Sequence, residues 1–271
     1  MSTQNTLVDG EFLDAVPATD RGFLFGDHVF ETMLWNGQSI PLWSFHWHRL
    51  HKSCQRLGFV APSEEVLLAD VQRLMGLIPE PKASILRLTV TRGSSATGYW
   101  IPDNLSARRV LQVRDLPASI AEQQEVGLRV KTASMRLPST DFGQGLKHGN
   151  RLLQVMCAQE CGREKMDEVI IYRDNGTVAE AMASNVILVG SGQLISPDDP
   201  EVWGVGLEWL GTLDLGLEMR RITRSDIECA EEVLLINSVA GVRPVVELDD
   251  RALAIGKTCR QLQVHWRGLY S

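Results

Sequence analysis

Short strand patterns and amphipathic helix patterns alternate along the whole chain, and this mixture most constrains its fold. Residues 84–91 (SILRLTVT) alternate apolar and polar side chains, which predicts a half-buried strand, and residues 110–113 predict a second strand of the same layer. Apolar residues at spacings of three and four predict a core-facing helix. That stripe consists of Trp43, Trp47, Leu50, Cys54 and Leu57.

The second half of the chain carries the same mixture. Residues 127–137 predict a strand and residues 150–161 predict a helix. Residues 168–172 and 184–190 predict two strands of one sheet that are joined by a turn at 174–176 (DNG). Since both halves mix helices with strands, we expect an α/β (mixed α+β) fold.

The chain is long enough for two modest domains. Residues 91–109 are rich in glycine, serine, proline and asparagine, which predicts a long loop, and residues 114–124 are typical of a connector. We therefore place a boundary near residue 117. The expected parts are an N-terminal domain at 1–113, a linker at 114–122 and a C-terminal domain at 123–271.

Composition excludes several classes of protein. The 271 residues include 27 Lys and Arg against 34 Asp and Glu, a net charge of −7, and 44% are hydrophobic, which argues against a disordered chain. Without a lysine-rich run, nucleic acid is not an expected partner. The longest apolar stretches, such as 186–189 and 233–236, are too short to span a membrane.

The cysteines and the N-terminus predict a cytoplasmic protein. Five cysteines without a CxxC pair fit a reducing compartment better than a disulfide framework. Cys157 and Cys161 would lie one helical turn apart, as small buried side chains. The first residues, MSTQNTLVDGEF, lack the basic and apolar regions of a signal peptide.

One lysine stands out among the six in the sequence. Lys147 lies in GQGLKHGNRLLQ, where glycines at 143, 145 and 149 would let a backbone or a ligand approach closely. Burial would lower the pKa of its amine toward neutrality, and such an amine can form a Schiff base. From the residues alone, an ordinary loop lysine remains the commoner alternative.

Other motifs do not support common chemistries. His46 and His48 would point to different sides of one helix with no cysteine or carboxylate to complete a site, so no metal is expected. The GSSATG segment lacks the GxGxxG spacing of dinucleotide sites, and neither a GxxxxGK[ST] loop nor a GxSxG elbow occurs.

Several motifs together resemble one family. DRGFLFGDHVFET (20–32) is similar to the opening of the fold-type IV, or class IV, pyridoxal-phosphate enzymes. WSFHWHRLHKSCQRLG (43–58) resembles the helix with that family's phosphate-binding arginine, and GLKHGNRL its catalytic-lysine segment. TVAEAMASNVILV (177–189) and EEVLLINSVAGVRPV (231–245) resemble two further segments of the family. The resemblance covers nearly the whole chain in the right order.

The resemblance implies an architecture and a cofactor. It implies an N-terminal α/β sandwich and a C-terminal barrel-like domain, with pyridoxal 5'-phosphate in the cleft between them. A homodimer acting on a small molecule is also implied.

The resemblance also assigns roles to individual residues. Lys147 would hold the cofactor as a Schiff base and later move a substrate proton, and Glu180 would pair with the pyridine nitrogen. Arg49 would clamp the phosphate as a forked donor. Taken alone, Glu180 is more readily interpreted as a solvated strand-end carboxylate, and the alternative for Arg49 is a surface helix arginine. The remaining expected cofactor contacts are Asn185, the amides near Val205 and Gly206, and the Asn237–Ser238 pair.

The substrate-side residues are drawn from the same resemblance. Thr32 would assist proton movement near Lys147, whereas Arg92 and Asn150 would contact the substrate. The strand threonine and the loop arginine are more often structural. The segment VGLE departs from the family pattern after Val205, because a Thr or Ile followed by a basic residue is usual there.

Within the family, three features favour the aminodeoxychorismate lyases over the aminotransferases. HWHRLHKSCQRL resembles the lyase form of the arginine helix, and TRGSSATGYW resembles the lyase loop, although Thr97 replaces its usual arginine. Asn150 is followed by Arg151, whereas the aminotransferases usually have a tyrosine there. The implied activity converts 4-amino-4-deoxychorismate to 4-aminobenzoate and pyruvate, in folate synthesis.

Two alternatives stay open. One is a class IV aminotransferase acting on D- or branched-chain amino acids. The other is a catalytically degenerate protein that binds pyridoxal phosphate in a regulatory or scaffold role, against which the retained Lys147, Glu180 and Arg49 argue.

Overall fold

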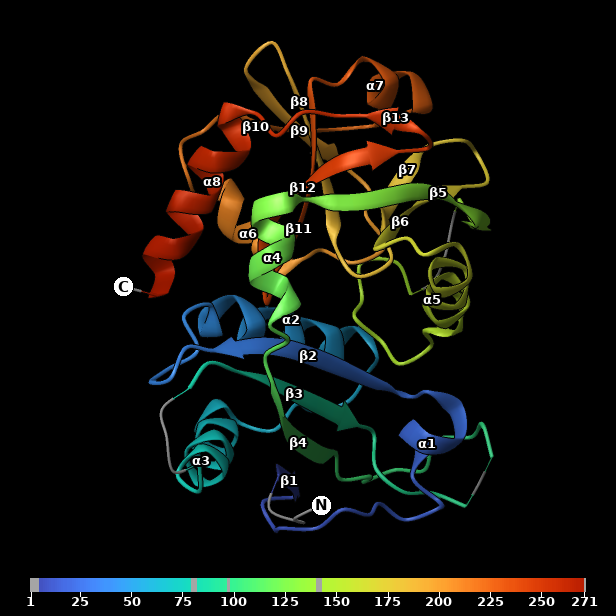
Figure 1. Cartoon of the computed structure of the whole chain (residues 1–271). Coiled ribbons are helices and arrows are strands. Elements are labelled where there is room, and N and C mark those ends of the chain that lie inside the picture. The colour runs from blue at the N-terminus through green and yellow to red at the C-terminus, as the bar shows by residue number, and fades with distance from the viewer. Residues whose placement is uncertain (1–4, 79–81, 97, 140–142, 271) are drawn as a thin grey trace. The chain divides into compact units, whose positions relative to one another are not determined.

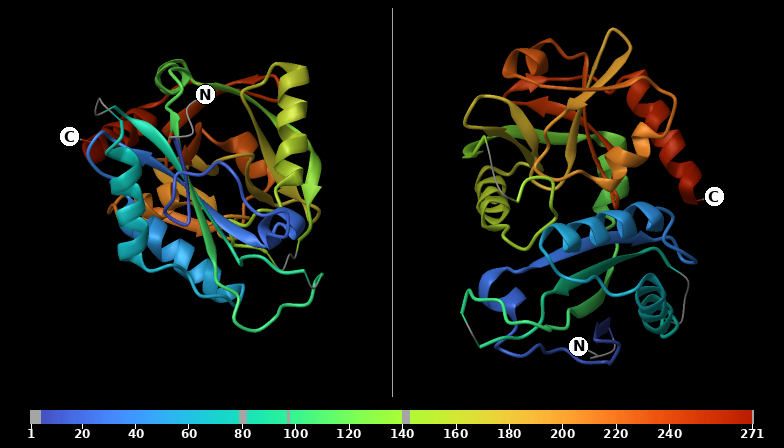
Figure 2. Two further views of the ribbon diagram at one scale, coloured as in Figure 1. Left: turned by 90° about the horizontal axis from the view of Figure 1, so that it is seen from below. Right: turned by 180° about the vertical axis from the view of Figure 1, so that it is seen from behind.

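The computed structural model describes residues 5–78, 82–96, 98–139 and 143–270 (Figures 1 and 2). Thr97, which departs from the lyase loop, lies outside the described residues. The chain divides into two compact units. The first comprises Met1–Leu116 with Lys147–Asn150, and the second comprises Pro117–Leu146 with Arg151–Ser271.

The first unit contains a four-stranded antiparallel sheet in the order β1-β4-β3-β2. The strand expected at 84–91 is β3, and the strand expected at 110–113 pairs with it as part of β4. Both predictions are confirmed. The side chains of β3 are alternately buried and half-buried over most of its length, and β4 pairs with β3 in the same sheet. The four strands are β1 (Thr6–Val8), β2 (His28–Trp35), β3 (Ser84–Thr91) and β4 (Arg108–Asp115).

Two helices build the core of the first unit against one face of this sheet. The predicted stripe lies on α2 (Trp43–Arg56), where Leu50 and Cys54 are buried. Helix α3 (Glu64–Met75) begins where the Ser63 hydroxyl accepts a hydrogen bond from the Val66 amide. Both helices pack with Leu86 and Leu88 of β3 in one apolar cluster. The side chains at the remaining, alternate positions of each strand point to the opposite face of the sheet.

The expected long loop follows β3 and contains no regular helix or strand among its described residues 92–96 and 98–107. It is held by Arg21 of the short helix α1 (Arg21–Phe25). The Arg21 guanidinium donates to the carbonyls of Gly98 (2.7 Å) and Trp100 (3.2 Å). A buried cation therefore fixes the backbone of this glycine-rich segment.

The second unit contains a mixed nine-stranded sheet with the order β10-β9-β8-β11-β12-β5-β6-β7, and β13 pairs with β12. The pairs β10–β9, β12–β5 and β5–β6 are parallel and the others are antiparallel. The strands are β5 (Leu128–Leu137), β6 (Glu168–Arg173), β7 (Val178–Ala181), β8 (Asn185–Gly190), β9 (Gln193–Pro197), β10 (Leu217–Arg220), β11 (Glu232–Asn237), β12 (Gly241–Leu248) and β13 (Arg251–Ala252).

This sheet curls around an apolar core. Strand β7 contacts β8 and β9, although several strands separate them in the sheet order. One buried cluster draws residues from β5, β6, β7, β8, β11 and β12. Helix α5 packs against β5 and β6, and α8 against β11 and β12 (Figure 1). The helices are α4 (Ser119–Val126), α5 (Leu152–Glu164), α6 (Val205–Gly211), α7 (Arg224–Cys229) and α8 (Lys257–Arg267), followed by the 3₁₀ turn Gly268–Tyr270.

The structure corrects the expected arrangement in three places. The turn at 174–176 joins β6 to β7, a strand the sequence pattern missed, whereas β8 pairs with β9 and β11. Residues 114–122 are not a simple connector, because they contain the end of β4 and the start of α4. Lys147–Asn150, expected in the C-terminal domain, belongs to the first unit.

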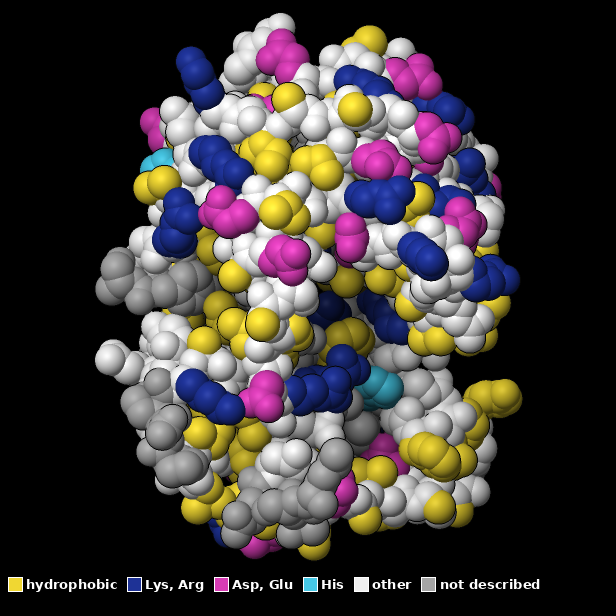
Figure 3. Space-filling view, in the orientation of Figure 1, with side chains coloured by type: hydrophobic (Ala, Val, Ile, Leu, Met, Phe, Trp, Pro, Cys, Tyr) yellow, Lys and Arg dark blue, Asp and Glu magenta, His cyan; other side chains and the backbone are white. Residues whose placement is uncertain are grey.

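Charged side chains of both signs lie on the surface, and two cysteines of α5 lie in the interior. On the face shown in Figure 3, basic and acidic side chains are interspersed. In the described part of the chain, every helix is too short or too polar to cross a membrane. Cys157 and Cys161 are both buried on α5, as the sequence predicts.

Candidate active site

Lys147 lies beside strand β2. The Phe30 amide donates to the Lys147 carbonyl (2.9 Å), and the Gly149 amide donates to the His28 carbonyl (2.9 Å). The lysine Nζ lies 4.6 Å from the centroid of the Phe30 ring, and the side chain is half-buried. Glycine is needed at 149, since a Cβ there would lie 2.0 Å from the His28 ring. The glycine-rich segment thus permits the close approach that the sequence predicts.

A buried ion pair holds Arg49 in the first unit. Arg49 on α2 donates through Nε to Glu31 Oε1 (2.8 Å) and through Nη2 to Glu31 Oε2. His46 Nδ1 lies 2.6 Å from Glu31 Oε2. Burial raises the pKa of Glu31, but the charge and hydrogen bonds of Arg49 outweigh it and lower the pKa to about 2. Glu31 is therefore ionised at neutral pH and fixes the arginine fork.

The role of Glu31 was not predicted from the sequence, although a charged residue at a core-facing strand position usually indicates a buried partner. His46 shares this buried cluster, and burial lowers its pKa. His48 is exposed on another side of α2. Among the described residues, no group of three or more histidine, cysteine or acidic side chains is placed to hold a metal ion.

Thr32 lies two residues beyond Phe30 on β2. Its register partner on β3 is Arg87, so the two side chains occupy the same face of the sheet. The structure thus brings Thr32 into the same region as Lys147. Asn150 ends the Lys147–Asn150 segment, and its side chain lies against Gly26, where a Cβ would be 2.2 Å from its Oδ1.

Arg92 does not fit the expected role at a substrate. It is buried and donates to the Asp27 carboxylate through Nε (2.8 Å) and Nη2 (3.1 Å). It also donates to the carbonyls of Leu57 (2.7 Å) and Gly58 (3.1 Å). Burial opposes the ionised form of Asp27, but Arg92 and Arg21 outweigh it and lower the pKa of Asp27. We therefore replace the substrate assignment of Arg92 with a structural one.

In the second unit, Glu180 and Asn185 bind the same peptide group. The Val202 amide donates to Glu180 Oε2 (2.9 Å), and Asn185 Nδ2 donates to the Val202 carbonyl (3.0 Å). Both side chains are buried. Gly204, which precedes α6, packs on Asn185, since a Cβ would lie 1.8 Å from Asn185 Oδ1. The structure thus brings Glu180, Asn185 and the start of α6 together.

The segments around Val205–Gly206 and Asn237–Ser238 also meet. A Cβ on Gly206 would lie 3.1 Å from the main chain of Asn237. The Asn237 Oδ1 accepts hydrogen bonds from the amides of Val239 (3.0 Å) and Ala240 (2.7 Å), which fixes the turn that contains Ser238. Val205 is buried at the first turn of α6.

A buried chain of polar groups supports this turn and was also missed from sequence. Asn237 Nδ2 donates to Ser184 Oγ (3.2 Å), and Arg243 Nη2 donates to the same oxygen (2.9 Å). Arg243 lies 3.9 Å from the buried carboxylate of Glu168. Burial raises the pKa of Glu168 to about 7, although Arg243 opposes that rise.

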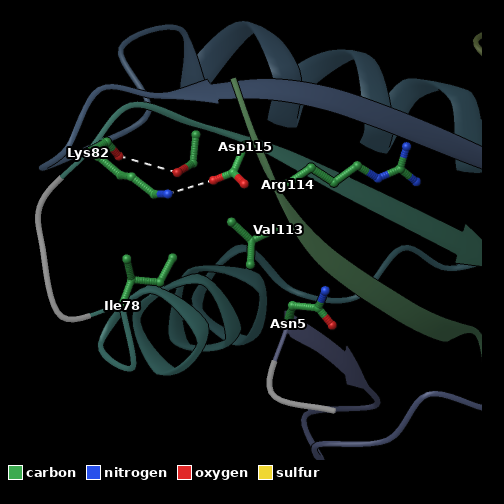
Figure 4. Close-up of a pocket in the computed structure, with 7 residues that line it drawn as sticks. Asn5, Ile78, Lys82, Val113, Arg114 and Asp115 are labelled. Atoms are coloured by element: carbon green, nitrogen blue, oxygen red, sulfur yellow. Dashed lines mark hydrogen bonds and ion pairs between the residues drawn. The ribbon is translucent and has the colours of Figure 1, made fainter. Parts of the chain in front are cut away.

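A pocket of about 440 Å³ lies elsewhere in the first unit (Figure 4). Its exposed ion pair joins Lys82 Nζ to Asp115 Oδ1 at 2.6 Å. None of the expected site residues lines it, so we do not assign it to the reaction. The expected residues instead form two sets, one in each unit. The first unit holds Thr32, Arg49, Arg92, Lys147 and Asn150, and the second holds Glu180, Asn185, Val205, Gly206, Asn237 and Ser238.

Comparison with known proteins identifies the family. The family Amino-transferase class IV matches residues 28–248, and the chain belongs to this family. Membership confirms the fold-type IV resemblance and the expected cofactor, pyridoxal phosphate.

Similar proteins include both lyases and aminotransferases. An aminodeoxychorismate lyase from Vibrio harveyi is 27% identical over 260 residues, which cover 92% of this chain and 94% of that protein. A D-alanine aminotransferase from Bacillus licheniformis is 28% identical over 250 residues, which cover 89% and 86%. The crystal structure of 4-amino-4-deoxychorismate lyase from Pseudomonas aeruginosa has a TM-score of 0.86 and 31% identity, covering 97% of this chain and 98% of that one. This likeness confirms the mixed α/β fold.

Proposed function

We propose that this protein is a pyridoxal-phosphate-dependent lyase that converts 4-amino-4-deoxychorismate to 4-aminobenzoate and pyruvate. The observation that carries the proposal is Arg151, which stands directly after Asn150 where aminotransferases of the family usually have a tyrosine. Its Nη2 donates to the Leu146 carbonyl (2.7 Å). The likeness to the P. aeruginosa lyase supports the same activity.

The side chains fit the proposed cofactor chemically. Lys147 supplies an amine for the cofactor aldehyde, Arg49 supplies a cation for the phosphate, and Glu180 supplies a buried carboxylate for the pyridine nitrogen. The Val205–Gly206 amides and the Asn237–Ser238 turn would complete the phosphate contacts, and Asn185 would support them through the Val202 peptide.

The chain's own residues would then move the substrate's protons. Pyridoxal phosphate, when bound, supplies an acceptor for the electron pair of a broken bond. The released amine of Lys147 removes the proton from the carbon that carries the substrate nitrogen, and Thr32 assists this transfer. The neighbouring carbon–oxygen bond breaks, the ring becomes aromatic, and protonation of the departing enolpyruvyl group gives pyruvate. Asn150 is proposed to contact the substrate.

Product analysis tests this proposal. The holoenzyme should release 4-aminobenzoate and pyruvate in equal amounts from 4-amino-4-deoxychorismate without any keto acid. The Lys147→Ala variant should lose this release, whereas Lys52→Ala, which removes an exposed lysine of α2, should retain it. Borohydride reduction should attach the cofactor to the peptide that contains residue 147. Attachment elsewhere, or undiminished turnover by Lys147→Ala, would contradict the proposed role of this lysine.

An aminotransferase acting on D- or branched-chain amino acids is the second candidate, because the B. licheniformis D-alanine aminotransferase is as similar as the V. harveyi lyase. It requires a keto acid to receive the amino group. Formation of D-glutamate from D-alanine and 2-oxoglutarate, without pyruvate release from 4-amino-4-deoxychorismate, would favour this activity over the lyase.

The resemblance also supports a homodimer in the cytoplasm. Light scattering on the purified holoenzyme should give twice the 30.1 kDa mass of the chain. A monomeric mass would contradict the proposed dimer while leaving the lyase activity to be judged from its products.

A further inference from the structure

Arg173 is a buried cation at the end of strand β6. Its side chain is 1% exposed, and its guanidinium donates through Nη1 to the Pro138 carbonyl (2.9 Å) and through Nη2 to the Asp199 carbonyl (3.0 Å). Arg173 Nη2 also lies 3.5 Å from Oε2 of Glu201, which is 2% exposed. All four residues belong to the second unit. The guanidinium therefore joins the residue after β5 to the segment 199–201.

Stability alone does not explain this buried ion pair. Removing Arg173 and Glu201 from water costs free energy that their attraction repays only in part, and well-packed apolar residues often give equal or greater stability. A guanidinium does give something that apolar side chains lack, because its planar fork orients the groups that it binds. The groups held by this fork therefore indicate what the pair does.

The same segment binds the carboxylate of Glu180. The carbonyl of Glu201 accepts a hydrogen bond from the Gly145 amide (2.9 Å). The N–H of the same peptide group is that of Val202, and it donates to Glu180 Oε2 (2.9 Å). A peptide carbonyl that accepts a hydrogen bond polarises the N–H of its own group, which strengthens the bond to the carboxylate. The ion pair of Glu201 thus lies one residue from the amide that holds Glu180.

We propose that Arg173 and Glu201 are positioning residues for Glu180, because their ion pair fixes the Val202 N–H that sets the direction of the Glu180 carboxylate. The inference rests on the proposed function, since Glu180 must be the partner of the pyridine nitrogen of pyridoxal phosphate. Contact with substrate or cofactor is assigned to neither Arg173 nor Glu201. Their effect on the reaction passes through one backbone amide and one carboxylate.

Amide hydrogen exchange tests the positioning without any turnover. Arg173→Lys keeps the positive charge near Glu201 but lacks the planar fork, so it cannot hold the carbonyls of Pro138 and Asp199 at the same time. In the holoenzyme, the Val202 amide of this variant should exchange about 10-fold faster than in the wild type, as expected for the loosening of one hydrogen bond.

Arg251→Lys is the matched control for the loss of an arginine fork. Arg251 also donates to two carbonyl groups of the second unit, those of Ile227 (2.8 Å) and Ala230 (2.7 Å) at the end of α7. Its substitution should lower the stability of the protein without changing the exchange of the Val202 amide, the absorbance of the bound cofactor or turnover.

A double-mutant cycle measures the coupling to Glu180. Arg173→Lys should lower turnover about 10-fold in the wild-type background and change the pH dependence of the cofactor absorbance, because the carboxylate no longer keeps its direction. In the Glu180→Gln background the same substitution should lower turnover less than about 2-fold. A merely structural role predicts the same fold-loss in both backgrounds, because the effects of independent sites multiply.

Glu201→Gln provides a second route to the same result. It removes the buried anion but keeps the size of the side chain and the backbone carbonyl that accepts from Gly145. It should change the exchange of the Val202 amide and the cofactor absorbance in the same direction as Arg173→Lys. If Arg173→Lys does not fold, the cycle with Glu180→Gln is measured with Glu201→Gln instead.

The outcomes distinguish this inference from the proposed function. Equal fold-losses in the two backgrounds, or unchanged exchange of the Val202 amide in Arg173→Lys, would overturn the positioning role and leave the lyase proposal standing. Transamination without pyruvate release would overturn the lyase proposal alone, because Glu180 would serve the cofactor in either reaction, and the cycle would then be measured on transamination. A protein that takes up no pyridoxal phosphate would overturn the proposed function, and the inference with it.

Discussion

The guanidinium of Arg49 and the carboxylate of Glu31 form a forked, buried ion pair between α2 and β2. The pair sets the direction of the arginine proposed for the cofactor phosphate, because rotation of the guanidinium would break both hydrogen bonds. His46 Nδ1 also contacts the Glu31 carboxylate. Glu31 of β2 thus positions Arg49 of α2 before any ligand binds.

Glu31→Gln tests the strength of this pair. The variant leaves the buried Arg49 charge without its anion and should lower the free energy of unfolding at pH 7 by about 3–5 kcal/mol. Urea denaturation measures the change. Asp115→Asn breaks the exposed Lys82–Asp115 pair and should change the free energy by less than about 1 kcal/mol. Equal losses of unfolding free energy in the two variants would show that burial does not determine the strength of the ion pair.

The same pair predicts an acid dependence. The pKa of Glu31 is held at about 2 in the folded state against a usual 4.5, so its contribution is complete above pH 4.5 and is lost as the pH falls toward 2. The stability difference between wild type and Glu31→Gln should shrink over that interval. A difference that stays constant from pH 5 to pH 2.5 would show that the charge of Glu31 is not its source.

Glu180→Gln tests the proposed partner of the pyridine nitrogen. The amide oxygen of glutamine can still accept from the Val202 amide, so the fold around β7 should persist while the charge is removed. Turnover should fall on the order of 10²–10³-fold, as for other electrostatic contributions to a transition state. The absorbance of bound cofactor should change as well. Glu208→Gln, on the exposed side of α6, is the control and should keep wild-type turnover.

Local patterns in the sequence were sufficient to predict the elements whose signal lies within one segment. The alternation in 84–91 identified β3, and the apolar stripe of 43–57 identified α2, because one buried face imposes each period. The motifs around Arg49, Lys147 and Glu180 identified the family. Each of these depends on residues within a single segment.

Contacts between distant segments could not be predicted in the same way. Lys147–Asn150 joins the first unit because it pairs with β2, more than a hundred residues earlier in the chain. Arg92 was a reasonable substrate residue until Asp27 and the end of α2 were seen to occupy its donors. The ionised state of Glu31 likewise depends on Arg49 and His46, which lie on a helix that follows it in the chain.

Gly204→Ala should disturb the start of α6. Its Cβ would lie 1.8 Å from Asn185 Oδ1, so Asn185 must move and weaken its hydrogen bond to the Val202 carbonyl. The expected loss is about 1–3 kcal/mol in the free energy of unfolding, with weaker cofactor binding. Gly211→Ala is the matched control, because no atom lies within 4 Å of its Cβ position, and it should be neutral or slightly stabilising. Similar losses in both variants would point to a general effect on α6.

Glu168→Gln tests the buried carboxyl beside Arg243. Burial raises the pKa of Glu168 from 4.5 to about 7, so the folded state holds this proton more tightly than the unfolded state does. Stability should therefore decrease as the pH rises from 4.5 to 7, by at most about 3 kcal/mol from this group. The Glu168→Gln variant should lack that part of the decline, whereas Glu122→Gln, on the exposed face of α4, should follow the wild-type curve. Thermal or urea unfolding at pH 5, 6, 7 and 8 measures the difference. A wild-type curve that is flat or rises across this interval, with Glu168→Gln parallel to it, would mean that the Arg243 charge outweighs the desolvation of Glu168.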